Sequence, residues 1–217
     1  LKYYVKQGDD FNNITPIRKT STNSITFAAT DGSSTVVVTD SSHGAVTGDT
    51  VTFAQAVSLG GVITATVLNQ EYIVNKSLTT NTYNIIAKDT SGSTVTANSS
   101  DSGNGGSGVD GSYEINVGLD IYVKGTGWGA GTWGAGGFGS VSTIDPVNQL
   151  RLWSQDNFGD DLISNIRSGG IFYWDESEGV TERAIPFTSL TNASAPPTAA
   201  LQIMVSDIDR HIICFGA

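Results

Sequence analysis

Between residues 24 and 90, short runs of β-branched and aromatic residues alternate with turn residues. Runs such as Thr35–Thr39 and Thr50–Phe53 place every second side chain on the same side of an extended chain. Asp31-Gly32 and Gly60-Gly61 are turn pairs that separate such runs. Short strands with turn signals between them predict a small antiparallel sandwich or barrel.

One small core is expected inside this module. Its predicted members are the apolar residues of the β-like runs: Val36, Val38, Val51, Phe53, Val62, Val67, Ile73, Tyr83 and Ile85. Alternation does not fix which face of a strand is buried, because a slip of one residue turns every side chain to the other face.

The chain changes character after about residue 148, where larger apolar residues and more charges appear. Three antiparallel strands are predicted at Leu150–Ser154, Asp161–Ile166 and Ile171–Asp175, and a further pair at Ala200–Ser206 and Arg210–Phe215. The middle run is also compatible with a short helix. Three strands closed by tight turns are typical of most of one propeller blade or of a sandwich sheet.

A second core, separate from the first, is expected in this part of the chain. Its predicted members are Leu152, Ile171, Tyr173, Val205 and Ile213. The opening run Leu1–Val5 is expected to join this second body, because the module at 24–90 looks like an insertion. Since the chain starts inside a β-like run and without Met, we expect it to be an excerpt of a longer or processed polypeptide.

One stretch in the middle of the chain is poor in core-forming residues. Ser91–Ser112 is rich in Ser, Gly and Asn, which indicates a flexible linker or an exposed loop. The sequence as a whole predicts an all-β protein, part propeller-like or sandwich body and part inserted module. The expected divisions are 1–20 for a strand of the main body, 21–90 for the module, 91–140 for the linker and Gly/Trp loop, and 141–217 for the main body.

The Gly/Trp loop contains a pattern found in dinucleotide-binding loops. Gly129–Gly134 matches G-x-G-x-x-G, but the residues after it do not start a helix, so a nucleotide cofactor is not predicted. The loop is better described as a repeat of Trp-Gly-Ala-Gly. Trp128, Trp133 and Phe138, together with Tyr173, are candidates for a subunit contact or for stacking on a sugar. For the loop itself, the interpretation that we favour is that it packs on its own domain.

Composition argues against several classes of function. The net charge of −10 is opposite to the basic footprint of a nucleic-acid binder. The sequence contains no run of apolar residues long enough to predict a membrane-spanning helix. The single cysteine, Cys214, lies in an apolar run, which favours a buried side chain over a nucleophile.

Neither a metal site nor a catalytic site is predicted. His43 and His211 lie far apart and lack neighbouring ligands at zinc spacing; His43 is expected to bond to the backbone in a turn. Acidic residues cluster from Asp156 to Glu178, and such a cluster invites a glycosidase or a calcium site. The same spacing is also ordinary turn chemistry, which we favour. The chain is therefore predicted not to be an enzyme and to hold no cofactor.

Several segments resemble stretches in tail proteins of tailed bacteriophages, namely the large β-rich hub or nozzle proteins. These segments are Leu1-Lys-Tyr-Tyr-Val5, Asn13-Ile-Thr-Pro-Ile-Arg18, Leu150–Gly159, Gly169–Asp175 and Ser206–Gly216. The segments His43–Val51, Leu68–Tyr72 and Asn81–Tyr83 resemble a small β module inserted in many phage structural proteins. The resemblance covers about half of the chain and rests on turn and aromatic residues.

The resemblance implies a virion protein of the tail, with a propeller-like body, that forms a ring of identical copies around the DNA channel. The implied partners are its own copies, other tail or portal-adaptor proteins, and passing DNA without sequence-specific binding; a membrane is not a primary partner. The negative charge would keep such a wall from adhering to DNA. The rival functions are a carbohydrate-binding adhesin, a capsid decoration protein and, last, a glycosidase.

Overall fold

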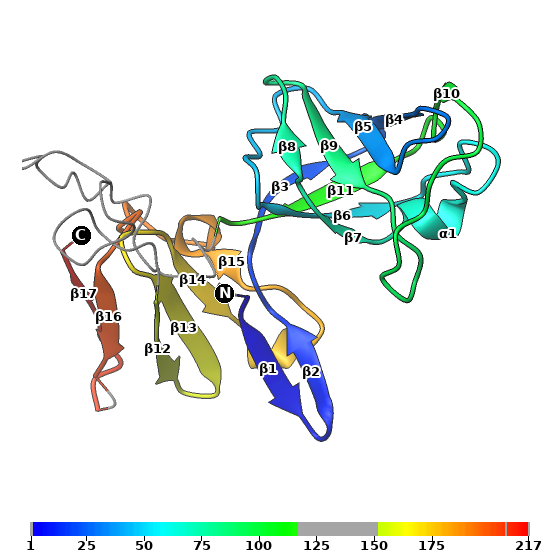
Figure 1. Ribbon diagram of the computed structural model, residues 1–217. Helices are drawn as coiled ribbons and strands as arrows, with labels where there is room; N and C mark the ends of the chain where they lie inside the picture. The colour runs from blue at the N-terminus through cyan, green and yellow to red at the C-terminus, as the bar shows by residue number, and fades with distance from the viewer. Residues whose placement is uncertain (1, 117–151, 207, 217) are drawn as a thin grey trace, which may run out of the picture. The chain divides into compact units, whose positions relative to one another are not determined.

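The computed structural model describes residues 2–116, 152–206 and 208–216. Every sheet in these ranges is antiparallel, and the helices are single short turns, so the predicted all-β class is confirmed. The chain forms two compact units (Figure 1). Ile17–Asn116 is called the sandwich unit, and Leu1–Pro16 together with Val117–Ala217 is called the meander unit.

The sandwich unit consists of two antiparallel sheets. One has the strand order β10-β4-β5-β9-β8, and the other β3-β11-β6-β7. Their bounds are β3 (Ile17–Ser21), β4 (Thr26–Ala29), β5 (Thr35–Thr39), β6 (Thr50–Ala54), α1 (Ala65–Leu68), β7 (Glu71–Ile73), β8 (Lys76–Ser77), β9 (Thr82–Ile86), β10 (Asp101–Asn104) and β11 (Asp110–Glu114).

The alternation of apolar and polar residues in the sequence corresponds to the alternation of buried and more exposed side chains along the strands. In β5, β6 and β9 every second residue is buried, and these residues meet in one core between the two sheets. The predicted members that lie in this core are Val36, Val38, Val51, Phe53, Val67, Tyr83 and Ile85. The prediction of a single core for the module is therefore confirmed in these residues.

The predictions for Val62 and Ile73 are wrong, since both side chains are exposed. On β7 it is Tyr72 that pairs with the buried Val51 and shares its inward face, which turns Ile73 outward. Val62 lies in a turn closed by a bridge between Gly60 and Ile63, and Ile63 is the residue that enters the core. Both errors are slips of one residue.

The meander unit is built on a four-stranded sheet with the order β12-β13-β14-β15. The middle run, predicted as a strand with a helix as alternative, is a strand. The bounds are β1 (Tyr4–Gln7), β2 (Asp10–Asn13), β12 (Trp153–Phe158), β13 (Asp161–Ile166), β14 (Ile171–Trp174), η2 (Glu176–Glu178), β15 (Ile185–Pro186), η3 (Phe187–Ser189), β16 (Gln202–Val205) and β17 (Ile212–Phe215).

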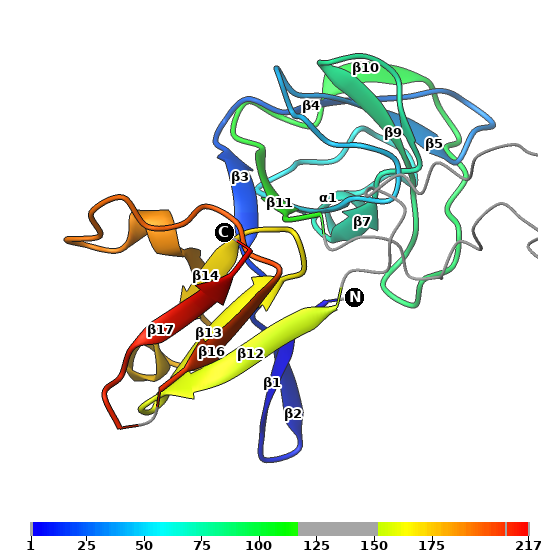
Figure 2. The same cartoon turned by 90° about the vertical axis from the view of Figure 1, so that its left-hand side faces the viewer.

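The two faces of this sheet are covered by different segments. On one face the β16–β17 hairpin packs on β12 and β13 (Figure 2). On the other face Tyr3 stacks on Trp153, with ring centroids 4.7 Å apart. The N-terminal segment is fixed further by a hydrogen bond of 3.1 Å from the Ala184 amide to the carbonyl of the fully buried Ile14.

The second core lies between the sheet and the β16–β17 hairpin. Of its predicted members, Ile171 and Val205 are buried there, and Tyr173 packs against them. The predictions for Leu152 and Ile213 are wrong, because both are exposed. Leu152 precedes the first paired residue of β12, and on β17 the neighbours of Ile213 face the core instead.

The expected divisions of the chain differ from the units at two places. Residues 17–20, expected in the main body, begin β3 of the sandwich unit. The first part of the expected linker at 91–140 contains β10 and β11, and its residues Ala97 and Val109 are buried in the core of the sandwich. These strands are not apparent in the sequence because their apolar content is low; β11, for example, includes glycine and serine. Among the described residues, no helix is long and apolar enough to span a membrane.

Candidate interaction surface

The β16–β17 hairpin presents one apolar face to the core and a second one away from it. Ile203 and Val205 of β16 are buried, and Ile212 and Cys214, their partners on β17, pack against the same core. Burial raises the pKa of the Cys214 thiol, so its reactive thiolate form is disfavoured. Cys214 is half-buried, less than its sequence context predicts, and it packs against this core as a small apolar residue.

The edge of β16 that faces β12 is closed by side chains. Ser154 Oγ accepts a hydrogen bond from the Ile203 amide at 3.2 Å and donates one to the Ile203 carbonyl at 3.1 Å. Asp156 Oδ2 accepts from the Val205 amide at 2.7 Å. These three bonds replace the backbone ladder that a neighbouring strand would make, so the hairpin is held on its sheet by β12.

The opposite edge, on β17, has no partner strand among the described residues and is called the open edge. A bond of 2.8 Å from the Ser206 amide to the His211 carbonyl sets the alternation of the ladder, so that Ile213 bonds inward to β16. By the same alternation Ile212 and Cys214 direct their amide and carbonyl groups outward. Within the described ranges, no residue pairs with these groups. An edge of this kind is a template for a further strand.

The outward side of the hairpin is largely apolar. Met204 and Ile213 lie directly opposite each other and are 43% and 42% exposed, and Phe215 on the same side is 46% exposed. Gln202, opposite Phe215, is the polar member of this side. These residues, Gln202, Met204, Ile213 and Phe215, are called the outer face. Strands with apolar residues on both faces are typical of sheets that are covered on both sides.

Of the four aromatic residues predicted from the sequence as contact sites, the structure describes Tyr173. Its ring packs against the second core, and its hydroxyl donates a hydrogen bond to Asp161 Oδ2. Burial, with the bond to the Asp161 carboxylate, raises the pKa of Tyr173 to about 12. The ring is thus held by its own unit. Trp128, Trp133 and Phe138 lie outside the described residues, and a contact role for these four stays a prediction.

Two of the acidic residues between 156 and 178 accept hydrogen bonds from nearby backbone amides. Asp161 accepts from the Glu176 amide at 3.1 Å, and Asp175 caps the short helix η2 by accepting from the Ser177 amide at 2.9 Å. In the parts of the chain that the structure describes, no group of three or more His, Cys, Asp or Glu side chains is placed to hold a metal ion. The bonds accepted by Asp161 and Asp175 are the turn chemistry that the sequence analysis favours.

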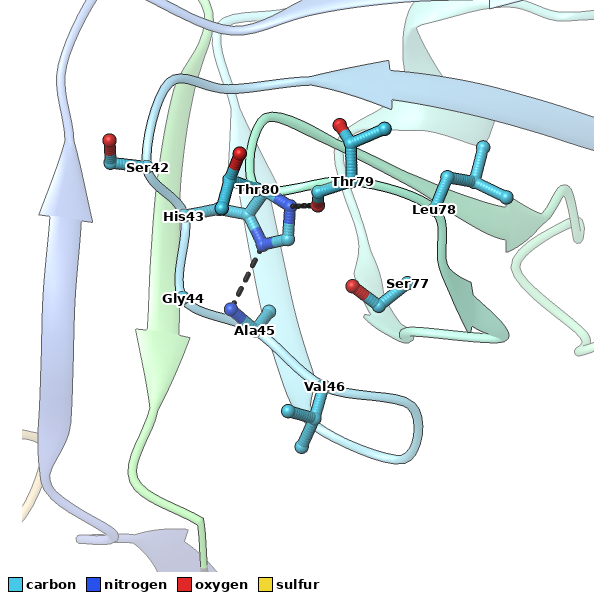
Figure 3. Close-up of a pocket in the computed structure, with 9 residues that line it drawn as sticks. All are labelled: Ser42, His43, Gly44, Ala45, Val46, Ser77, Leu78, Thr79 and Thr80. Carbon is cyan, nitrogen blue, oxygen red and sulfur yellow. Dashed lines mark hydrogen bonds between the residues drawn. The ribbon is translucent and has the colours of Figure 1, made fainter.

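The sandwich unit contains a surface hollow of about 480 Å³ (Figure 3). Buried His43 forms its floor. Its Nε2–H group donates to the Thr79 carbonyl at 3.0 Å, because Nδ1 accepts from the Ala45 amide at 2.9 Å. The expected bonding of His43 to the backbone is therefore confirmed. With both nitrogens engaged, the ring has no free site for acid–base chemistry, and the rim consists of hydroxyl and small apolar residues such as Val46 and Leu78.

A buried polar network lies beside the hollow, and the sequence analysis did not anticipate it. Asp40 Oδ2 accepts hydrogen bonds from the hydroxyls of Ser21 and Tyr113, each at 2.7 Å. The same oxygen forms an ion pair with Lys19 Nζ at 3.3 Å. The Tyr83 hydroxyl bonds to that of Tyr113 at 2.9 Å. Burial raises the pKa of both tyrosines, so both stay neutral. These residues come from β3, β9, β11 and a turn, and no local pattern links them.

Comparisons with known proteins give a remote likeness among solved structures. No family model and no curated protein matches the chain. The phage phi92 endosialidase is similar with a TM-score of 0.34 and 15% sequence identity, over 89% of this chain and 27% of that one. The chain thus spans about a quarter of the length of that protein.

Proposed function

We propose that this chain is a structural, non-enzymatic subunit of the tail of a tailed bacteriophage, and that it forms part of a hub or nozzle ring around the DNA channel. The sequence segments that resemble tail hub and nozzle proteins support the choice of the tail. The observation that carries the role as a subunit is the β16–β17 hairpin, with its apolar outer face and the open edge of β17.

The outer face supports assembly because it is costly to leave in water. Met204, Ile213 and Phe215 place three large apolar side chains together on one small hairpin. Contiguous apolar patches are uncommon on monomeric proteins and often mark a contact with another protein. Three acidic side chains of the cluster between 156 and 178 have structural roles, because Asp156, Asp161 and Asp175 each accept a hydrogen bond from a backbone amide. The negative net charge suits a wall that DNA passes without adhering.

Two further partners belong to this proposal: neighbouring tail or portal-adaptor proteins, and DNA in transit without sequence-specific contact. A glycan array distinguishes this proposal from the rival function of a carbohydrate-binding adhesin. A structural ring shows no preference for any saccharide, whereas a receptor-binding module binds a defined set. The rival of a capsid decoration protein is separated by the position of the chain on the particle.

The proposal is tested by the oligomeric state of the purified chain, measured by analytical ultracentrifugation over a range of concentrations. We expect the wild type to self-associate and Ile213→Lys to remain a monomer, because a charge on the outer face cannot be buried without a partner. Ile73→Lys is the matched control, since Ile73 is an exposed strand residue of the other unit. Equal self-association of the wild type and Ile213→Lys would contradict the proposal.

A further inference from the structure

We propose that the outer face of one copy is covered by the β1–β2 hairpin of a second copy, in a head-to-tail contact. This inference rests on the proposed function as a self-assembling subunit, and it names the two surfaces that meet. It assigns a role to the N-terminal hairpin, which the core of the meander unit does not explain.

The β1–β2 hairpin carries its own exposed aromatic face. Lys6 lies opposite Phe11, and Tyr4 lies opposite Asn13, so these four side chains share one side of the hairpin. Tyr4 is 48% exposed and Phe11 68% exposed. The Lys6 ammonium lies 5.8 Å from the centroid of the Phe11 ring, which orders that ring at the surface.

This hairpin is a two-stranded sheet of its own within the described residues. Two-stranded hairpins are marginally stable in water unless they pack against another layer. The described contacts of the N-terminal segment with its unit lie at its base, through Tyr3, Ile14 and Thr15. The aromatic face therefore gains stability when another surface covers it.

The two exposed faces of one copy lie on opposite sides of the same sheet. Tyr3 stacks on Trp153, whereas Ser154, the next residue of β12, bonds to β16. Adjacent residues of a strand point to opposite faces. Figure 1 shows β16–β17 on one side of β12 and β13, with β1–β2 on the other. The sheet thus prevents the hairpins of one copy from covering each other, whereas a second copy can bring them together.

A head-to-tail contact leaves neither apolar face exposed between adjacent copies. An isologous contact between two outer faces would leave Tyr4 and Phe11 in water. Aromatic rings also pack well on methionine and isoleucine, since the polarisable sulfur of Met204 contacts ring edges favourably. Contacts of this heterologous type close into a ring when the rotation between copies permits it. Because two hairpins bury less area than a standard interface, we expect a single contact to be weak.

Disulfide trapping between two separately purified variants of the full chain tests the contact. Both carry Cys214→Ala, which removes the one native thiol. One variant adds Phe11→Cys and the other Met204→Cys, with a size tag on the second. Mixed and oxidised, they are expected to give a heterodimer several-fold above either homodimer. The matched control replaces Met204→Cys by Thr90→Cys, an exposed turn residue of the sandwich unit.

Each outcome decides the inference. A heterodimer that forms with Met204→Cys and not with Thr90→Cys supports it. Equal yields with both partners, or a dominant Met204→Cys homodimer, overturn it, and the homodimer would assign an isologous contact instead. If the chain self-associates but gives no specific heterodimer, the inference fails while the proposed function stands. If the heterodimer forms but the chain is absent from the tail, the proposed function fails while the contact stands.

Discussion

The most buried charge of the sandwich unit belongs to Asp40, which is 2% exposed. Its carboxylate is stabilised by two hydroxyl donors and by the ammonium of Lys19. Lys19 also donates to the Ser41 carbonyl at 2.9 Å, so one ammonium ties the turn after β5 to β3. A buried charge of this kind is tolerated only when its partners are all present. The network therefore fixes how the two sheets meet.

We expect Asp40→Ala to destabilise the sandwich unit by about 3–5 kcal/mol, because it leaves the Lys19 ammonium without its partner and two buried hydroxyls without their acceptor. Chemical denaturation followed by tyrosine fluorescence measures this change. Asp31→Ala, at an exposed turn position, is the control and should change the free energy of unfolding by no more than about 0.5 kcal/mol. Similar effects of the two substitutions would contradict the role of the network.

The meander unit should lose stability at alkaline pH. Burial raises the pKa of Tyr3 from 10.0 to about 12, and that of Tyr173 also to about 12. The unfolded chain loses these protons near pH 10 and the folded chain near pH 12, so the stabilisation is complete below pH 10 and is lost as the pH rises to 12. Unfolding by urea at pH 9 and at pH 11 measures the loss. It should shrink in Tyr3→Phe and Tyr173→Phe; an unchanged pH dependence in the double variant would contradict it.

At the scale of the element, the sequence predicted strands well and faces less well. Strong alternation located β5, β6 and β9 and most of their core residues. It failed at β7 and β17, where two adjacent apolar residues compete for the inward position: Tyr72 with Ile73, and Ile212 with Ile213. In each case the partner strand sets the register, and partners are not visible in a local pattern.

The register of β7 predicts that substitutions of two neighbouring residues change the free energy of unfolding by very different amounts. Tyr72→Ala should cost about 3–5 kcal/mol, because it removes a buried ring that contacts Phe53. Ile73→Ala should change the free energy of unfolding by about 0.5 kcal/mol or less, since its side chain is exposed. Thermal or chemical unfolding of the two variants checks this. A larger loss for Ile73→Ala would show that the strand has the register expected from sequence.

The open edge of β17 and its outer face were beyond the sequence analysis for a related reason. The sequence predicts a strand at Arg210–Phe215 and places Ile213 in the second core. Only the ladder shows that Ile212 and Cys214 face inward while Ile213 and Phe215 face outward. The hydrogen bonds from β16 to Ser154 and Asp156 are equally non-local, since each joins residues that are 49 positions apart in the sequence.

At the scale of the whole molecule, the described residues of the two units form separate cores that share no residue. The sandwich unit, Ile17–Asn116, is continuous in sequence, and the meander unit is made from the segments on both sides of it. A continuous unit with its own core should fold alone. We therefore propose that the sandwich unit is an insertion in the meander unit.

The isolated fragment 17–116 is expected to unfold in a single cooperative transition, because its core is complete without the rest of the chain. Calorimetry of the fragment and of the full chain measures this. The full chain should show a transition at the midpoint of the fragment and a second one for the meander unit. A fragment that is unfolded at 25 °C would contradict the independence of the unit, provided that the full chain is folded under the same conditions.

The position of the chain on the virus particle tests the central claim most directly. Immunogold labelling of purified particles with antibodies raised against the sandwich unit locates it by electron microscopy. Our account predicts that gold gathers at the tail, at the vertex where the tail joins the head or along the tail axis. Gold spread over the head lattice would contradict this and would identify a decoration protein. Intact particles that carry no gold would contradict the assignment to the virion.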